Sequence, residues 1–218
     1  MTPHRLRAAL FDLDGTLIDS VALLLASMRH AFVGFTGEHP TDADWIAGLG
    51  TPLWLQLAAY ARSDAEVTLL RSRYREFQVE HHDRMVRAFP GTAATLAALE
   101  ARGIAMALVT SKMDAGAHHS LAHTSLARYF PVVIGADSVT KHKPDPEPVI
   151  VALERLGIAP TAALFVGDSP HDMASGNAAG VATVAALWGP FTREQLAVAS
   201  PSLWLADIQD LPALVDQP

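Results

Sequence analysis

Short apolar runs of strand length recur along this chain, and segments of helix length separate most of them. The runs that predict buried strands are Ala8–Leu10, Ile104–Val109, Val132–Ile134, Ala163–Val166, Val181–Ala185 and Leu203–Leu205. Helical composition or apolar spacing predicts helices at Thr92–Ala101, Asp114–Ala127, Pro146–Leu156 and Asp172–Ala179. Because strands and helices alternate, we expect an α/β fold with a parallel sheet and helices on both of its faces.

The region from residue 18 to residue 88 interrupts this alternation, because it contains no convincing strand pattern. Its helical patterns lie at Val21–Phe32, Pro52–Ala61 and Ala65–Val86. A candidate helix N-cap, Asp19-Ser20, stands at its start, and a turn signal, Phe89-Pro90-Gly91, stands at its end. We therefore predict a helical cap domain at residues 18–88, inserted into a core formed by residues 1–17 and 89–218.

The composition excludes several classes of function. Of the 218 residues, 50% are hydrophobic and 18% are charged, so the chain can bury a core. The net charge of −7 disfavours a nucleic-acid binder, and the absence of cysteine excludes disulfides and thiolate metal sites. The polar start Met1–Arg7 does not resemble a signal peptide, and the apolar run Val21–Ala26 is too short to span a membrane. We expect a cytoplasmic protein without nucleic-acid or membrane partners, and no feature specifies its oligomeric state.

The candidate chemistry begins at the end of the first predicted strand, in Phe11-Asp12-Leu13-Asp14-Gly15-Thr16-Leu17. In folds with a parallel sheet, ligands bind beyond the carboxyl ends of the strands. Two carboxylates two residues apart, Asp12 and Asp14, can face one pocket there, and Gly15 lets the chain turn away sharply. Because Asp-Gly is also a common turn, this motif alone does not decide between a catalytic and a structural role.

Three later strand ends add hydroxyls, a lysine and two acids. Thr110-Ser111-Lys112 offers hydroxyls and backbone amides to phosphate oxygens, although a Ser or Thr after a strand is also a common helix cap. Lys143, in the segment Lys141–Pro146, can neutralise phosphate charge, unless that segment is a solvated surface loop. Asp168 and Asp172 can complete an oxygen-ligand magnesium site, or they can simply start a helix.

In this order, each at a strand end, the four segments resemble the motif set of the haloacid dehalogenase-like hydrolase superfamily, across essentially the whole chain. The similarity is strongest to its phosphoglycolate phosphatase-like and pyrophosphatase-like members. The shared motifs are Phe-Asp-Leu-Asp-Gly-Thr-Leu, Val-Thr-Ser-Lys, Lys-Pro-Asp-Pro, and Val-Gly-Asp-Ser followed by an acid. The resemblance implies a Rossmann-like core with an inserted cap, and a magnesium-dependent phosphatase that acts on a small phosphate ester through an aspartyl-phosphate.

The resemblance also implies roles for the acids. Asp12 would be the nucleophile, and Asp14 would be a general acid/base that is protonated in the resting complex. Mg²⁺ would be held by Asp12, the backbone carbonyl of Asp14 and Asp168, with Asp172 as a supporting acid. Dehalogenases of the superfamily have no aspartate at the position of Asp14, so its presence here favours phosphoryl transfer.

Phosphate contacts are implied for Thr110, Ser111 and Lys143. A phosphate monoester dianion repels a carboxylate nucleophile, so a lysine and a metal ion must first cancel charge around the transferring group. A phosphosugar mutase of the same superfamily is the alternative function. Against it, Thr16 stands where we expect an apolar residue in mutases, and the cap has no Arg-Leu-Lys motif.

The loop Gly48–Leu53, between two helical stretches of the cap, is a candidate specificity element. It is similar to a segment of the family that faces the catalytic pocket, which makes Gly50 and Thr51 candidate substrate contacts. The alternative is a mere turn between helices. The physiological substrate itself has no recognisable motif in the sequence.

Ten histidines raise the question of a second metal site. His119 and His123 are spaced i, i+4 with His118 beside them, and His81 and His82 form a pair. The sequence identifies no third ligand for either group, and a zinc site needs three or four convergent ligands. We therefore expect these histidines to be solvated.

Overall fold

The central sheet of this computed structural model, which describes residues 6–215, has six parallel strands in the order β5-β4-β1-β6-β7-β8. The strands are β1 (Ala8–Phe11), β4 (Ala105–Val109), β5 (Val132–Ile134), β6 (Ala163–Gly167), β7 (Ala182–Ala186) and β8 (Leu203–Leu205). Every predicted strand is present, with ends that differ by no more than about one residue, the usual uncertainty of strand limits. Residues 1–5, from the polar start of the chain, lie outside the described residues. The predicted parallel sheet is confirmed.

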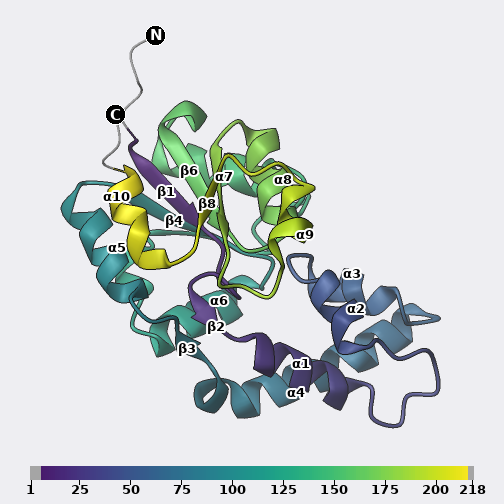
Figure 1. Cartoon of the computed structure of the whole chain (residues 1–218). Helices are drawn as coiled ribbons and strands as arrows, with labels where there is room; N and C mark the ends of the chain where they lie inside the picture. The colour runs from purple at the N-terminus through teal and green to yellow at the C-terminus, as the bar shows by residue number, and fades with distance from the viewer. Residues whose placement is uncertain (1–5, 216–218) are drawn as a thin grey trace.

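Helices cover both faces of this sheet (Figure 1). One face carries α7 (Glu147–Leu156) and α8 (Pro170–Ala179), with α9 (Arg193–Ala197) beside α8, and the other carries α5 (Thr92–Ala101), α6 (Asp114–His123) and α10 (Leu211–Val215). Because side chains alternate along a strand, Leu10 of β1 packs into the first layer and Phe11 into the second. The predicted helix Asp114–Ala127 ends early, at His123, and Ser125 then adopts a left-handed conformation with φ 60°.

Four further helices lie between β1 and β4 in the sequence, and we call them the helical insertion. They are α1 (Val21–Ala31), α2 (Asp42–Ala47), α3 (Leu53–Ala58) and α4 (Asp64–Met85), of which α2 was not predicted. The insertion has an apolar cluster of its own, which includes Trp45, Leu57 and Leu70, and it lies apart from the sheet (Figure 1). Among the described helices none is both long and apolar enough to cross a membrane.

A two-stranded antiparallel pair connects the helical insertion to the rest of the chain. β2 (Ile18–Asp19) and β3 (Arg87–Ala88) pair Ile18 with Ala88 and Asp19 with Arg87. The expectation of no strand between residues 18 and 88 is wrong at these two ends. Two residues are too few to show a periodic pattern, and the partner strand lies at the far end of the insertion. The chain therefore enters and leaves the insertion at neighbouring points.

Candidate active site

The ends of β1 and β6 bring the predicted acids together. These strands pair in parallel, with Phe11 opposite Val166, so Asp12 and Asp168 follow them at the same edge of the sheet. Carboxylate oxygens of Asp12, Asp168 and Asp172 all lie within 4.8 Å of one another, and all three residues are buried. The sequence thus correctly indicated residues that meet, from segments about 150 positions apart in the chain.

Lys143 lies in the centre of this carboxylate cluster. Its buried Nζ donates hydrogen bonds to Asp12 Oδ1 at 2.7 Å and to Asp172 Oδ1 at 2.6 Å. It also lies 3.3 Å from the carbonyl oxygen of Val109, at the end of β4. The segment that carries Lys143 is therefore not a solvated loop at this residue. The lysine joins the ends of β1 and β4 to the first turn of α8, and it compensates part of the negative charge buried there.

Local structure fixes the position of two of the acids. Gly15 has φ +89°, and a Cβ there would lie 2.5 Å from Asp168 Oδ2, so a side chain is excluded on both counts. Thr16 Oγ1 donates to Asp168 Oδ1 at 2.6 Å. Asp172 forms a capping box with Ser169 at the start of α8, through its Oδ2. The helix start considered as the alternative for Asp172 is therefore real, and it points Oδ1 toward Lys143.

Burial and like charge shape the electrostatics of the cluster. Burial raises the pKa of Asp12 to about 7, although the charge of Lys143 opposes the rise. Burial also raises the pKa of Asp168 well above its usual value, and the charges of Asp12 and Asp172 add to the effect. Burial would lower the pKa of Lys143, but the two neighbouring carboxylates outweigh it and raise that pKa.

The donor set of this cluster fits a divalent cation that prefers oxygen. Three buried carboxylates face a single ammonium group, so negative charge is left uncompensated. Mg²⁺ is a hard cation that binds carboxylate and carbonyl oxygens, and it would supply the missing positive charge. The residues present therefore fit such an ion.

Asp14 lies at the edge of the cluster and has partners that the sequence did not reveal. Its Oδ1 accepts hydrogen bonds from Ser20 Oγ at 2.6 Å and from Lys112 Nζ at 3.0 Å. Ser20, expected to cap a helix, makes no side-chain cap bond because its hydroxyl binds Asp14 instead. Among residues 6–215, no group hydrogen-bonds Asp14 Oδ2. That oxygen is available to a ligand.

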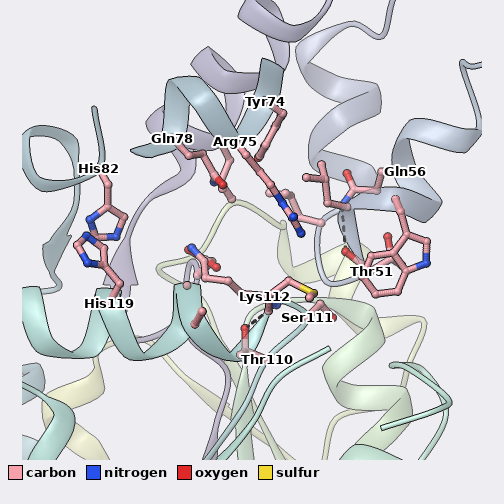
Figure 2. Close-up of a pocket in the computed structure, with 18 of the residues that line it drawn as sticks. Thr51, Gln56, Tyr74, Arg75, Gln78, His82, Thr110, Ser111, Lys112 and His119 are labelled. Carbon is pink, nitrogen blue, oxygen red and sulfur yellow. Dashed lines mark hydrogen bonds and ion pairs between the residues drawn. The ribbon is translucent and has the colours of Figure 1, made fainter. Parts of the chain in front are cut away.

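A cavity of about 570 Å³ opens above these residues, between the sheet and the helical insertion. Thr110 and Ser111 lie on its sheet side, and Thr51 lies on the side of the insertion (Figure 2). Trp54 of α3 also lines the cavity. Arg75 points into the cavity from α4, toward the side that carries Thr110 and Ser111 (Figure 2). Within the described part of the chain, Arg75 has no hydrogen bond or ion pair, so its guanidinium is available to an anionic group. Nothing in the charged sequence of α4 distinguished this arginine from its neighbours.

The two predicted hydroxyls after β4 have different surroundings. Thr110 is buried and accepts a hydrogen bond from the amide of Lys112 at 3.2 Å, which leaves its hydroxyl hydrogen for a ligand. Ser111 Oγ donates to the carbonyl oxygen of Gly50 at 2.5 Å, so its hydroxyl contacts the helical insertion. A phosphate contact from Ser111 therefore stays a prediction.

The loop of Gly50 and Thr51 lies against the start of α8, beside the carboxylate cluster. Gly50 has φ +95°, and a Cβ there would lie 2.6 Å from Ser169 Oγ and 3.2 Å from a ring carbon of His171. Thr51 lines the cavity, and its hydroxyl donates to the carbonyl of Gly48 at 2.7 Å. Gly50 and Thr51 both line the cavity, and a substrate contact from this loop stays a prediction.

Histidines gather at the other end of the cavity. His82, near the end of α4, is buried, and His119 lies on α6 facing it (Figure 2). Both rings contact the carboxylate of Asp83. Burial lowers the pKa of His82, although its hydrogen bond to Asp83 opposes the change. The expectation of a solvated side chain is wrong for His82, because packing of α4 against α6 brings together residues that are distant in sequence.

Comparisons with known proteins agree with this geometry. A family model described as haloacid dehalogenase-like hydrolase matches residues 9–186. Pyrophosphatase PpaX of Oceanobacillus iheyensis is 35% identical over 210 residues, which cover 96% of this chain and 97% of that protein. The phosphoglycolate phosphatase of Shigella boydii serotype 4 is 33% identical over 235 residues, covering 96% of this chain and 92% of that protein.

The fold is also shared by a solved structure that is not described as a phosphatase. A chain from Bacteroides vulgatus, provisionally described as a β-phosphoglucomutase, matches with a TM-score of 0.84 at 22% identity. The match covers 97% of this chain and 88% of that one. At this level of identity the likeness concerns the fold alone.

Proposed function

Because this chain belongs to the haloacid dehalogenase-like hydrolases, we propose that it is a magnesium-dependent phosphatase that acts on small phosphorylated metabolites. The observation that most supports this proposal is the meeting of Asp12, Lys143 and Asp168 in one buried cluster beside a cavity. In this proposal residues 1–17 and 89–218 form the catalytic core. Residues 18–88 form a cap that selects the leaving group.

The metal-binding part of the proposal rests on oxygen donors. Asp12, Asp168 and the backbone carbonyl of Asp14 would hold Mg²⁺, which when bound would cancel charge on the phosphoryl oxygens. Thr16 would keep Asp168 in place through its hydrogen bond. Asp172 would act as a supporting acid, because it fixes the ammonium group of Lys143.

Two balanced displacements make up the proposed reaction. Asp12 attacks the phosphorus in line, the bond from phosphorus to the leaving oxygen breaks, and Asp14 donates a proton to that oxygen. Water then attacks the phosphorus of the aspartyl-phosphate, Asp14 takes the proton, and the bond to Asp12 breaks. The products are the free alcohol, or a second phosphate, and inorganic phosphate. Lys143 and Thr110 would stabilise the phosphoryl oxygens in both steps.

The cationic side chains that line the cavity favour a leaving group that is itself anionic. Arg75 reaches into it from α4, and Lys112 lies on the opposite side, bonded to Asp14. The relatives are named for pyrophosphate and for phosphoglycolate, and in both compounds the part that leaves carries a second negative charge. We propose substrates of this kind for the present chain, with Thr51 and Gly50 contacting the leaving group.

An isosteric change at the nucleophile tests the proposal. Asp12→Asn should abolish magnesium-dependent phosphate release, because an amide is a poor nucleophile and a weaker metal ligand. Asp19→Asn, at an exposed acid of β2, is the matched control and should keep wild-type activity. Circular dichroism checks that both variants fold. Retention of even a tenth of the wild-type rate in Asp12→Asn would exclude Asp12 as the nucleophile.

A phosphosugar mutase is the second candidate, because the fold is shared with a chain described as a β-phosphoglucomutase. A mutase would return the phosphoryl group to the sugar instead of to water. A coupled assay for isomerised sugar phosphate, run beside an assay for inorganic phosphate, separates the two. Phosphate release without isomer is the expected result, and isomer without phosphate would replace the phosphatase proposal.

A further inference from the structure

Four side chains with metal-ligating atoms gather where α4 meets α6, at the end of the cavity that carries His82 and His119 (Figure 2). His82 Nδ1 lies 2.8 Å from Asp83 Oδ1, and His119 Nε2 lies 2.9 Å from the same oxygen. His123 Nδ1 lies 3.5 Å from it. Ligand atoms of His82, Asp83 and His119 are all within 4.8 Å of one another. The further ligands that could not be identified from the sequence for His119 and His123 are thus His82 and Asp83, on α4.

The number and type of these donors fit a tetrahedral transition-metal ion. With bonds of about 2.0–2.1 Å, such an ion places neighbouring ligand atoms about 3.3 Å apart. The three distances that share Asp83 Oδ1, which are 2.8, 2.9 and 3.5 Å, lie close to that spacing. The ligand atoms of His82 and His119 lie within 4.8 Å of each other, and His123 joins this group through its contact with Asp83. Three imidazoles and one carboxylate suit Zn²⁺, whereas Mg²⁺ prefers sites made of oxygen alone.

The outer ring nitrogens of two of these histidines are already held. His82 Nε2 lies 2.8 Å from Ser120 Oγ, and His123 Nε2 lies 3.2 Å from the carbonyl oxygen of Val86, to which it donates when it carries the hydrogen. In that tautomer Arg87 Nη1, at 3.4 Å from the same nitrogen, has no acceptor there. Histidine ligands usually form such a bond through the nitrogen that faces away from the metal, and it fixes the orientation of the ring. In both residues the other nitrogen, Nδ1, is the one that faces Asp83.

We propose that His82, Asp83, His119 and His123 form a Zn²⁺ site, distinct from the carboxylate cluster at Asp12. The two sites share no residue, and this proposal does not depend on the phosphatase activity. Two of the ligands belong to the helical insertion and two to α6 of the sheet layer. A bound ion would therefore cross-link the insertion to the core beside the β2–β3 pair. It would also fix the distance between α4, which carries Arg75, and the loop of Thr110 that precedes α6.

A Co²⁺ titration of the full-length protein tests the site directly. Mg²⁺ is present in excess to occupy oxygen ligands, and Co²⁺ serves as the probe because tetrahedral nitrogen-rich coordination gives a strong visible absorption. We expect a band that saturates at one equivalent and that one equivalent of Zn²⁺ removes. His119→Ala, an exposed position, should weaken Co²⁺ binding at least tenfold, and His123→Ala should do the same.

Two matched variants serve as controls. His118→Ala removes an exposed histidine next to His119 that lies outside the cluster, and it should bind Co²⁺ like the wild type. Asp168→Asn removes an acid of the other site and should keep the visible band. The proposal is overturned if the wild type shows no saturable band, if His119→Ala binds with unchanged affinity, or if Asp168→Asn loses the band.

The cross-link has its own measurement. With Zn²⁺ bound, amide hydrogen exchange in β2 and β3 should slow in the wild type, because these strands connect the two parts that the ion joins. His119→Ala should show no such effect of Zn²⁺. Unchanged exchange in the wild type after Zn²⁺ has bound would overturn the cross-link.

Discussion

The two polar clusters that face the cavity differ in burial and in the way their parts are held. The side chain of Asp172 is 1% exposed and contacts Lys143, whereas the side chain of Asp83 is 63% exposed and is surrounded by imidazoles. In the first cluster, Asp12 and Asp168 directly follow paired strands of one sheet, and Asp172 lies in the first turn of the helix after β6, so the sheet and the start of α8 fix the distances between these acids. The second cluster depends on how α4 of the insertion lies against α6. The carboxylate cluster is therefore preorganised by the core, whereas the histidine cluster forms only when the insertion and the core are in this arrangement.

Removal of Lys143 from the carboxylate cluster should have the largest effect on activity and stability. Lys143→Ala removes the ammonium group that compensates the buried carboxylates of Asp12 and Asp172, so we expect loss of activity and a decrease of about 3–5 kcal/mol in the free energy of unfolding. Urea unfolding and phosphate release measure the two effects. Lys141→Ala, with a side chain that is 69% exposed, is the control and should be neutral. An unchanged urea midpoint in Lys143→Ala would contradict the compensating role of the lysine.

A change at the proposed acid/base should have the next largest effect. Asp14→Asn cannot donate or accept the proton, so turnover of an alkyl phosphate should fall by about 100-fold or more. An aryl phosphate with a good leaving group needs less protonation and should lose less. Steady-state kcat for the two substrates, measured in parallel, checks the difference. An unchanged rate with the alkyl phosphate would remove Asp14 from the mechanism.

A comparison of two glycines tests the contact between the insertion and the start of α8. Gly50 and Gly34 both have positive φ, but a Cβ at Gly50 would meet Ser169, whereas at Gly34 nothing lies within 4 Å. Gly50→Ala should change relative kcat/KM among natural substrates by about tenfold, or about 1.4 kcal/mol. Gly34→Ala carries the same backbone strain and should not. If all substrates change by one common factor, the loop has only a structural role.

Arg75→Ala should have the smallest effect in this series. An exposed ion pair contributes up to about 1 kcal/mol, so KM for substrates with an anionic leaving group should rise about fivefold. KM for p-nitrophenyl phosphate should change less, because its leaving group carries no carboxylate or phosphate. Arg71→Ala, one turn earlier on α4 and away from the cavity, is the control. Equal changes in KM for both substrate classes would mean that Arg75 does not contact the leaving group.

The sequence predicted the first cluster because its geometry follows from strand order. Asp12 and Asp168 come directly after buried strands, and parallel pairing brings such positions to one edge. Ser20 shows where this reasoning ends. Its sequence context indicated a local helix cap, but its hydroxyl bonds Asp14, because a contact in the folded state competes with the local one. A hydroxyl has many possible partners, and only the fold selects among them.

The second cluster could not be predicted for a related reason. The i, i+4 spacing of His119 and His123 places them on one helix face, but their partners His82 and Asp83 belong to the insertion. The spacing of residues along α6 does not indicate which helix packs against it. The same holds for Arg75, one of several charged residues on α4, which is distinguished only by its direction into the cavity.

The β2–β3 pair has a consequence for how proteins of this architecture diversify. The backbone crosses from core to insertion at Ile18–Asp19 and back at Arg87–Ala88, and these crossings are hydrogen-bonded neighbours. A gene segment for residues 20–86 can therefore be exchanged for one of different length without moving any strand of the central sheet. If residues 18–88 select the leaving group as proposed, such an exchange would change the substrate while the strands that carry Asp12 and Asp168 stay in place.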